Sequence, residues 1–331
     1  MIATLVLTRF ATRPSLGEKG MFGVPLDKVF DPARLALRLE TLAMVTAPSL
    51  RAQTAQDFKW LIITDPMLPA ETRAKLEAVV ADMPQALIVR IDEVLEGGEN
   101  IGHRRWLEPF VAPEASHVLT ANLDNDDGLG RHFIERLRAQ AEADIGNPNV
   151  SAMRLYGQGQ ARQWDMFGVE GARFGAAKPW NRRDPWGRPY FMSPGYACCA
   201  PRRADIQVLG VPHHVAHAGE DRPEYLKRSR WLGGPRRRYT PQDSWFASHE
   251  RLRARLEGLD TLTPDRTACR WVCMMAGGEN ELLMLNHSSN AEAGRKSEKP
   301  EARREVVGPE SFGEVAVDWA RIEHFFKSQT S

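Results

Sequence analysis

The chain of 331 residues has few cysteines, almost no net charge and no long apolar run. Its 44 basic and 43 acidic residues give a formal net charge of +1, which argues against a dedicated nucleic-acid-binding protein. No apolar stretch reaches the roughly 18 residues of a membrane-spanning helix, and the N-terminus lacks the pattern of a secretory signal peptide. We therefore expect a cytoplasmic protein with no transmembrane segment, and peripheral association with the inner membrane face stays open.

The four cysteines are too few to predict a disulfide framework in a chain of this length. Cys198 and Cys199 are adjacent, which is too close for an ordinary bridge. Cys269 and Cys273 lack the second pair of ligands that a structural zinc site needs. We expect these side chains to be buried, unreactive thiols.

The first 145 residues alternate between apolar runs of strand length and segments of helix length. A helix should begin at Asp31 as N-cap with Pro32 in its first turn, and end near Pro48. This alternation predicts an α/β fold with a mainly parallel, Rossmann-type sheet flanked by helices. Strands are expected at 2–8, 59–65, 86–91 and 117–121, and further helices at 69–80, at about 100–110 and from 133.

The second half is less regular. Residues 164–196 mix aromatic side chains with Gly, Pro and Arg, which suits either sugar stacking or the packing of an irregular subdomain. A late strand is expected at 281–287, and the polar segment 288–305 has too little apolar surface to pack, so a mobile loop is expected there. The spacing of Val315, Trp319, Ile322 and Phe326 predicts an amphipathic C-terminal helix.

An acidic cluster follows the strand expected at 117–121. It comprises Asp124, Asp126 and Asp127, and its carboxylates would repel one another unless a cation neutralised them. On an extended backbone, Asp124 and Asp126 would point to the same side, where Mg²⁺ or Mn²⁺ could bind with substrate phosphates. The alternative is an acidic turn, because Asn, Asp and Gly are common turn residues.

Other polar residues fall at the same predicted edge. Thr8 and Arg9 end the first strand and Asp65 ends the second, as the acidic cluster ends the fourth. Ligands of such sheets bind beyond the carboxyl ends of the strands. This coincidence favours the metal-site interpretation over the turn.

Two segments resemble a known family. Residues 53–65, QTAQDFKWLIITD, and 123–129, LDNDDGL, are similar to motifs of GT-A nucleotide-sugar-dependent glycosyltransferases, most of all the bacterial rhamnosyltransferase family. The resemblance covers roughly residues 1–290. It implies a nucleotide-sugar-binding half at 1–145, an acceptor-side half at 146–290 that completes the same GT-A-like domain, and a loop with a C-terminal helix at 291–331.

The resemblance also implies roles for residues. Asp65 would face the nucleotide, and Asp124 and Asp126 would hold Mn²⁺ or Mg²⁺ against the donor diphosphate. Asp127 would either support the metal ligands without binding the ion or contact the sugar. The segment 283–290 is similar to a family motif in which His287 would be a third metal ligand, although Ser288 replaces the glycine of that motif.

Binding and catalytic candidates complete the predicted site. We expect Thr8, Arg9 and Arg104 to bind the nucleotide-sugar, since guanidinium groups suit phosphates. An inverting transfer needs a general base for the acceptor hydroxyl, for which Asp221 and Asp243 are the candidates.

The leading hypothesis is a metal-dependent glycosyltransferase that moves a sugar, rhamnose being one option, from a nucleotide-diphosphate donor to a glycan or lipid-linked glycan acceptor, with inversion. Two alternatives stay open. One is a catalytically silent glycan-binding or scaffold protein on the same fold, and the other is a nucleotidyltransferase, although residues 8–20 lack its glycine-rich phosphate loop.

Overall fold

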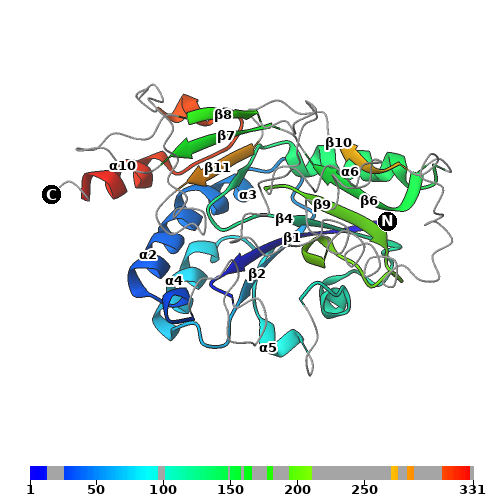
Figure 1. Cartoon of the computed structure of the whole chain (residues 1–331), viewed down its shortest axis with the longest axis horizontal. Helices are drawn as coiled ribbons and strands as arrows, with labels where there is room; N and C mark the ends of the chain where they lie inside the picture. Colours follow the sequence, from blue (N-terminus) through cyan, green and yellow to red (C-terminus); the bar gives the residue numbers. More distant parts are fainter. Residues whose placement is uncertain are drawn as a thin grey trace, which may run out of the picture.

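A large, mainly parallel sheet is the centre of the molecule (Figure 1). The computed structural model describes residues 1–12, 26–95, 101–147, 150–157, 160–165, 177–181, 194–210, 270–274, 282–286 and 308–328. Within these residues the sheet has seven strands in the order β10-β6-β9-β4-β1-β2-β3. Their bounds are β1 Ile2–Phe10, β2 Lys59–Thr64, β3 Ala86–Arg90, β4 His117–Asn122, β6 Val150–Gly157, β9 Ala197–Pro201 and β10 Arg270–Met274.

The strand directions agree with the expected α/β class. β4, β1, β2 and β3 pair in parallel, as do β6 and β10, while β9 lies antiparallel between β4 and β6. Consecutive parallel strands need crossover connections, and these are supplied largely by the helical segments between them. The predicted mainly parallel sheet is confirmed, and β9 is an addition that the sequence patterns did not indicate.

Helical segments cover both faces of the sheet. One apolar cluster joins β1, β2 and β4 to α2 (Pro32–Thr41), α3 (Ala47–Arg51), α4 (Ala70–Val80) and α6 (Phe133–Asp144). A second cluster joins the other face to α5 (Ile91–Val94), the 3₁₀ turn η3 (Arg105–Phe110) and η4 (Val208–Gly210). The short α1 (Leu26–Val29) precedes α2. Burial on both faces explains why the strands read as continuous apolar runs rather than as alternating ones.

The first long helical segment begins as predicted but does not end at Pro48. Asp31 caps α2 by accepting a hydrogen bond from the Arg34 backbone N–H at 2.9 Å, and the chain then continues through a π-helical turn, η2 (Leu42–Thr46), into α3. Pro48 has no N–H for the Met44 carbonyl. That carbonyl instead accepts a hydrogen bond from the backbone of Asp318 at 2.8 Å. The π-helical turn and this distant donor allow helical structure to continue through the proline.

A smaller sheet and the C-terminal segment lie beside the acidic cluster. Within the described part of the chain this sheet has the order β5-β11-β7-β8 and comprises β5 Gly128–Leu129, β11 Leu282–Asn286, β7 Gln160–Asp165 and β8 Ala177–Asn181. Its strand β5 packs against α3, and α10 (Trp319–Ser328) packs against η2. Three side chains of the C-terminal segment pack on η2: Phe312, which ends the 3₁₀ turn η7 (Pro309–Phe312), Val315, and Ile322 of α10. The predicted late strand and C-terminal helix are confirmed, and the helix begins at Trp319.

Two further predictions meet the structure differently. The prediction of a helix at about 100–110 is wrong in the type of helix. The helical part of this segment is the 3₁₀ turn η3, which contains Pro109. Cys198 and Cys199 are buried on opposite faces of β9, as expected. The loop expected at 288–305 lies outside the described residues. No helix among the described residues is long and apolar enough to cross a membrane.

Candidate active site at the carboxyl edge of the sheet

Three parallel strands bring the predicted polar residues to one edge. β1 pairs with β2 on one side and with β4 on the other, so their carboxyl ends lie together. Arg9 is near the end of β1, Asp65 directly follows β2, and the acidic residues follow β4. An ion pair joins two of these ends, with the Arg9 Nη2 atom 3.9 Å from the Asp124 Oδ1 atom. The predicted convergence of these residues is confirmed.

The acidic loop, residues 123–127, is a turn rather than an extended segment. The Asp127 N–H donates to the Asp124 carbonyl at 3.2 Å, which closes a four-residue turn around Asn125 and Asp126. The argument that an extended backbone points Asp124 and Asp126 to one side is therefore wrong. A turn still leaves carboxylates available to a cation, because turns supply oxygen ligands in many divalent-ion sites.

Neighbouring elements fix the position of the acidic loop. The Leu123 N–H donates to the Leu7 carbonyl at 3.0 Å, which ties the start of the loop to β1. At its other end the Thr46 hydroxyl of η2 donates to the Asp127 carbonyl at 2.9 Å. Asp126 and Asp127 are buried, while Asp124 keeps 37% of its side-chain surface exposed. Asp124 is therefore the carboxylate of the loop that is most open to a ligand.

The first residue of the motif at 53–65, Gln53, forms hydrogen bonds with the chain that follows the acidic loop. Gln53 is buried, and its side-chain amide donates to the Gly130 carbonyl at 2.9 Å and accepts from the Ile134 N–H at 3.1 Å. Gln53 therefore connects the end of α3 to the chain just beyond the acidic loop. The glutamine in this motif has a structural role that its sequence pattern alone did not specify.

Asp65 and Thr8 are both buried at the edge. Asp65 is 1% exposed, and its Oδ1 atom accepts a hydrogen bond from the Met67 N–H at 2.9 Å. The Thr8 hydroxyl accepts a hydrogen bond from the Trp60 indole N–H at 2.9 Å, within the core. Thr8 thus orients Trp60 on the neighbouring strand, and its role as a nucleotide ligand stays a prediction.

Arg9 lies in an unusual electrostatic setting. Burial lowers the pKa of its guanidinium, the nearby carboxylate of Asp124 acts to raise it, and the positive charge of Arg38 lowers it further, for a net pKa below the ordinary arginine value. Two residues later the buried Ala11 has a φ of 51°, a left-handed conformation that is costly for a residue with a Cβ atom. Strained backbone of this kind often accompanies binding sites.

Two arginines that the sequence analysis did not select also lie here. Arg34 and Arg38 of α2 are near the acidic loop, and the Asn125 side-chain amide donates to the Arg38 carbonyl at 3.4 Å. Burial and the charge of Arg38 lower the pKa of Arg34, while Asp31 and Asp126 act to raise it. The signal available in the sequence was their i, i+4 spacing, which places both on one side of the helix.

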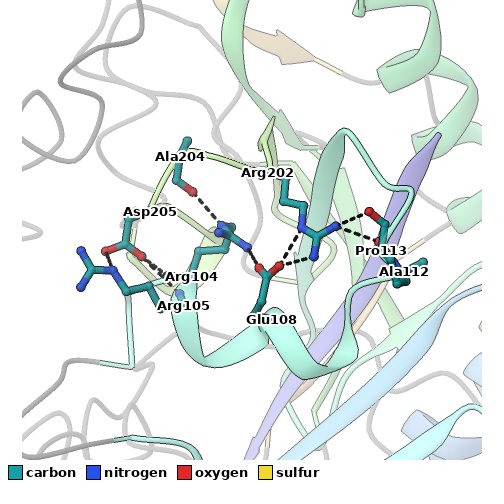
Figure 2. A network of polar contacts seen from close by, with 8 residues as sticks. All are labelled: Arg104, Arg105, Glu108, Ala112, Pro113, Arg202, Ala204 and Asp205. Atoms are coloured by element: carbon teal, nitrogen blue, oxygen red, sulfur yellow. Dashed lines mark hydrogen bonds and ion pairs between the residues drawn. The ribbon is translucent and has the colours of Figure 1, made fainter.

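Arg104 belongs to a separate polar network (Figure 2). Its Nε–H donates to the Ala204 carbonyl at 2.8 Å, and its Nη1 atom lies 2.5 Å from a carboxylate oxygen of Glu108, which also pairs with Arg202. Asp205 accepts from the backbone N–H of Arg104 at 2.8 Å. These contacts join η3 to the chain after β9, so the observed role of Arg104 is structural and its predicted contact with the nucleotide-sugar remains a prediction.

The remaining candidates lie outside the described residues. These are the proposed bases Asp221 and Asp243 and the proposed metal ligand His287. The part of the chain that the structure describes contains no group of three or more His, Cys, Asp or Glu side chains placed to hold a metal ion. Asp124 and Asp126 fit a hard divalent cation of the kind that is held by one or two carboxylates, with phosphate oxygens and water completing its shell.

A family model supports the class of protein that these residues suggest. Residues 22–152 match the family described as "Putative rhamnosyl transferase", a segment that includes both motifs, α2 and the acidic loop. The match confirms the predicted resemblance over this segment, which is narrower than the expected 1–290. The match covers less than half of the chain and agrees with the predicted enzyme class, a glycosyltransferase. A search of curated proteins found no match.

Solved structures give more distant matches. The chain is similar to S. aureus TarS 1-349 in complex with UDP (12% identity, 86% of this chain and 61% of that one, TM-score 0.32) and in complex with UDP-GlcNAc (14%, 52% and 38%, 0.27). It is also similar to the apo form of mouse xyloside xylosyltransferase 1 (13%, 60% and 67%, 0.28). The chain thus spans less than two thirds of the TarS chains, and similarity at this level carries no argument about the site.

Proposed function

We propose that the protein is a metal-dependent glycosyltransferase that uses a nucleotide-diphosphate sugar and transfers the sugar, with rhamnose as the first candidate, to a glycan or lipid-linked glycan. The observation that carries the proposal is the convergence of Asp65, Arg9 and the acidic loop at one sheet edge. Asp65 and the acidic loop lie inside the segment that matches the family.

The geometry suggests how the donor would be held. Asp124 and Asp126 are the proposed ligands of Mn²⁺ or Mg²⁺, which would neutralise the charge that develops on the departing diphosphate. Asp65, whose buried carboxylate is oriented by the Met67 N–H, is proposed to accept hydrogen bonds from the nucleoside. Asp127 is buried at the end of the loop and is proposed to face the sugar.

Transfer needs a proton acceptor for the attacking hydroxyl. In the proposed inverting reaction, the acceptor oxygen forms a bond to the anomeric carbon as the bond to the diphosphate breaks, and its proton passes to a carboxylate. Asp221 or Asp243 is the proposed base. His287 is proposed as a further metal ligand, and the site is proposed to face the cytoplasm, with acceptors delivered at the inner membrane face.

Thermal stabilisation tests this proposal directly. A ligand that binds only the native state raises the melting temperature, by an amount that grows with its concentration over its Kd. The panel contains UDP-, GDP- and dTDP-sugars, each with and without Mn²⁺. We expect one nucleotide to stabilise the protein, and the metal to increase its shift in melting temperature.

A matched pair of variants locates the effect. Asp126→Asn should abolish the metal-dependent shift, while Asp82→Asn should leave it unchanged, because Asp82 is an exposed partner of Arg51. An unchanged shift in Asp126→Asn would remove the metal assignment, and the absence of any shift across the panel in the unaltered protein would oppose the proposed donor class.

A further inference from the structure

Arg34 and Arg38 present two guanidinium groups beside the acidic loop. They are four residues apart on α2, each one position before a leucine that packs in the core, Leu35 or Leu39. The hydrogen bond from Asn125 to the Arg38 carbonyl places this part of α2 directly against the loop. The arginines therefore lie at the carboxyl edge of the sheet, on the side opposite to η3 and its network around Arg104.

Neither the Arg34 nor the Arg38 side chain is fully exposed to solvent, as it would be on the outer face of a surface helix. Both residues are half-buried, and the Nε–H group of each is buried without a hydrogen-bond partner in the structure. A buried donor without an acceptor is costly, and native proteins rarely keep one without a ligand, an ion or a functional reason. Asp31 Oδ1 accepts a hydrogen bond from the Arg34 backbone N–H, and the Asp31 carboxylate also acts on the Arg34 guanidinium as a nearby negative charge.

Charge repulsion adds to this cost. Arg38 is close enough to both Arg9 and Arg34 to disfavour their charged forms, so three positive groups share a small region with the carboxylates of Asp124 and Asp126. An anion with several oxygen atoms would relieve the repulsion and would accept the buried N–H groups. The guanidinium fork suits the oxygens of phosphate and diphosphate groups, which it can bind in a bidentate manner.

We propose that Arg34 and Arg38, together with Arg9, form a diphosphate-binding site of their own beside the acidic loop. This inference rests on the proposed function, since it identifies the diphosphate as that of the sugar donor. The arginines bind the oxygens on one side of the diphosphate, and the acidic loop faces the other side. The i, i+4 pair on a rigid helix thus determines where the leaving group lies.

Inorganic pyrophosphate is the probe, because it contains the diphosphate without a nucleoside or a sugar. Binding is measured by isothermal titration calorimetry, once with EDTA and once with Mn²⁺. The unaltered protein should bind pyrophosphate in EDTA, and Arg34→Gln and Arg38→Gln should each weaken that binding by about tenfold or more, the usual cost of a lost charge-assisted hydrogen bond. Arg34→Lys and Arg38→Lys should fall between, because they keep the charge and lose the fork.

Controls separate binding from folding. Arg51→Gln removes the same charge from the neighbouring α3, where Arg51 pairs with Asp82 at the surface, and should bind pyrophosphate like the unaltered protein. Without ligand, Arg38→Gln should melt at the same temperature or higher, since it removes a repelling charge. A purely structural arginine would instead lower the melting temperature and leave the affinity unchanged.

The remaining outcomes are informative. If the protein binds pyrophosphate only with Mn²⁺, or not at all, or if the glutamine variants bind it as well as the unaltered protein does, the arginine site is overturned while the proposed glycosyltransferase function can still hold. If pyrophosphate binds through the arginines but no nucleotide-sugar of the panel stabilises the protein, the anion site stands and the proposed donor class fails.

Discussion

Replacement of Gly128 by alanine should disturb the acidic loop through the C-terminal segment. Gly128 is the first residue after the loop, and a Cβ atom built there would lie 2.5 Å from the Val315 Cγ1 atom and 3.1 Å from the Val45 Cγ1 atom. Carbon atoms attract one another best at about 3.5–4.0 Å, so a contact of this length forces the segments apart. Overpacking of this kind costs about 1–3 kcal/mol.

The structure indicates which segment would move. Val315 is 4% exposed and packs on η2, and the chain beside it forms a bridge between Gly130 and Val315. The core strands are less free to shift than this segment. We therefore expect Gly128→Ala to lower the free energy of unfolding by about 2 kcal/mol. We also expect it to weaken metal-dependent nucleotide-sugar binding, because the C-terminal segment that it displaces packs against the residue that directly follows the acidic loop.

A double-mutant cycle by urea denaturation tests this reasoning. Val315→Ala alone should cost about 1–2 kcal/mol through lost packing. Gly128→Ala with Val315→Ala should be less destabilising than the sum of the single changes by about 1 kcal/mol or more, because the smaller side chain makes room for the new Cβ atom. Additive effects would refute the proposed contact between Val315 of the C-terminal segment and residue 128.

Other perturbations test the surrounding structure. Thr8→Val should cost about 1–3 kcal/mol in chemical denaturation, because it leaves the buried Trp60 indole N–H without its acceptor; no loss would mean that the bond is unimportant. Hydrogen bonds from Arg104 and Arg202 (Figure 2) lower the pKa of Glu108 in the folded protein. The ionised Glu108 carboxylate therefore stabilises the fold above the ordinary glutamate pKa of about 4.3, and this stabilisation is lost as the pH falls through the lower pKa of the folded state. The difference in stability between the unaltered protein and Glu108→Gln should therefore shrink below about pH 4, whereas a constant difference would contradict the ion-pair assignment. Burial raises the pKa of Cys199 to about 12, so thiol reagents at pH 8 should modify it only upon unfolding, and rapid labelling of the native protein would oppose this.

Most helices and strands of the first half could be predicted from the sequence, because the patterns that indicate them lie within the elements themselves. Apolar runs marked β1 to β4, and the Asp31-Pro32 pair marked the start of α2. The continuation past Pro48 was not predictable in this way. It depends on the Asp318 backbone, which donates to the Met44 carbonyl from a position far along the chain.

The candidate site was predictable to a similar extent. Parallel strands determine that Arg9, Asp65 and Asp124 share an edge, whereas the position of β1 between β2 and β4 was not predicted. The turn in the acidic loop and the closeness of Arg38 depend on how α2 and η2 pack against that edge. Such contacts are set by tertiary structure, and the pattern of a single segment does not contain them.

Release of nucleoside diphosphate from a nucleotide-sugar tests the central claim most directly. The measurement compares the unaltered protein, Asp126→Asn and Asp82→Asn, each with Mn²⁺ and with EDTA, using the nucleotide-sugar that stabilises the protein most. We predict release that requires Mn²⁺, that is lost in Asp126→Asn and that is retained in Asp82→Asn. Release that is equal in EDTA, or that persists in Asp126→Asn, would contradict the assignment of the acidic loop as the metal-binding part of a glycosyltransferase active site.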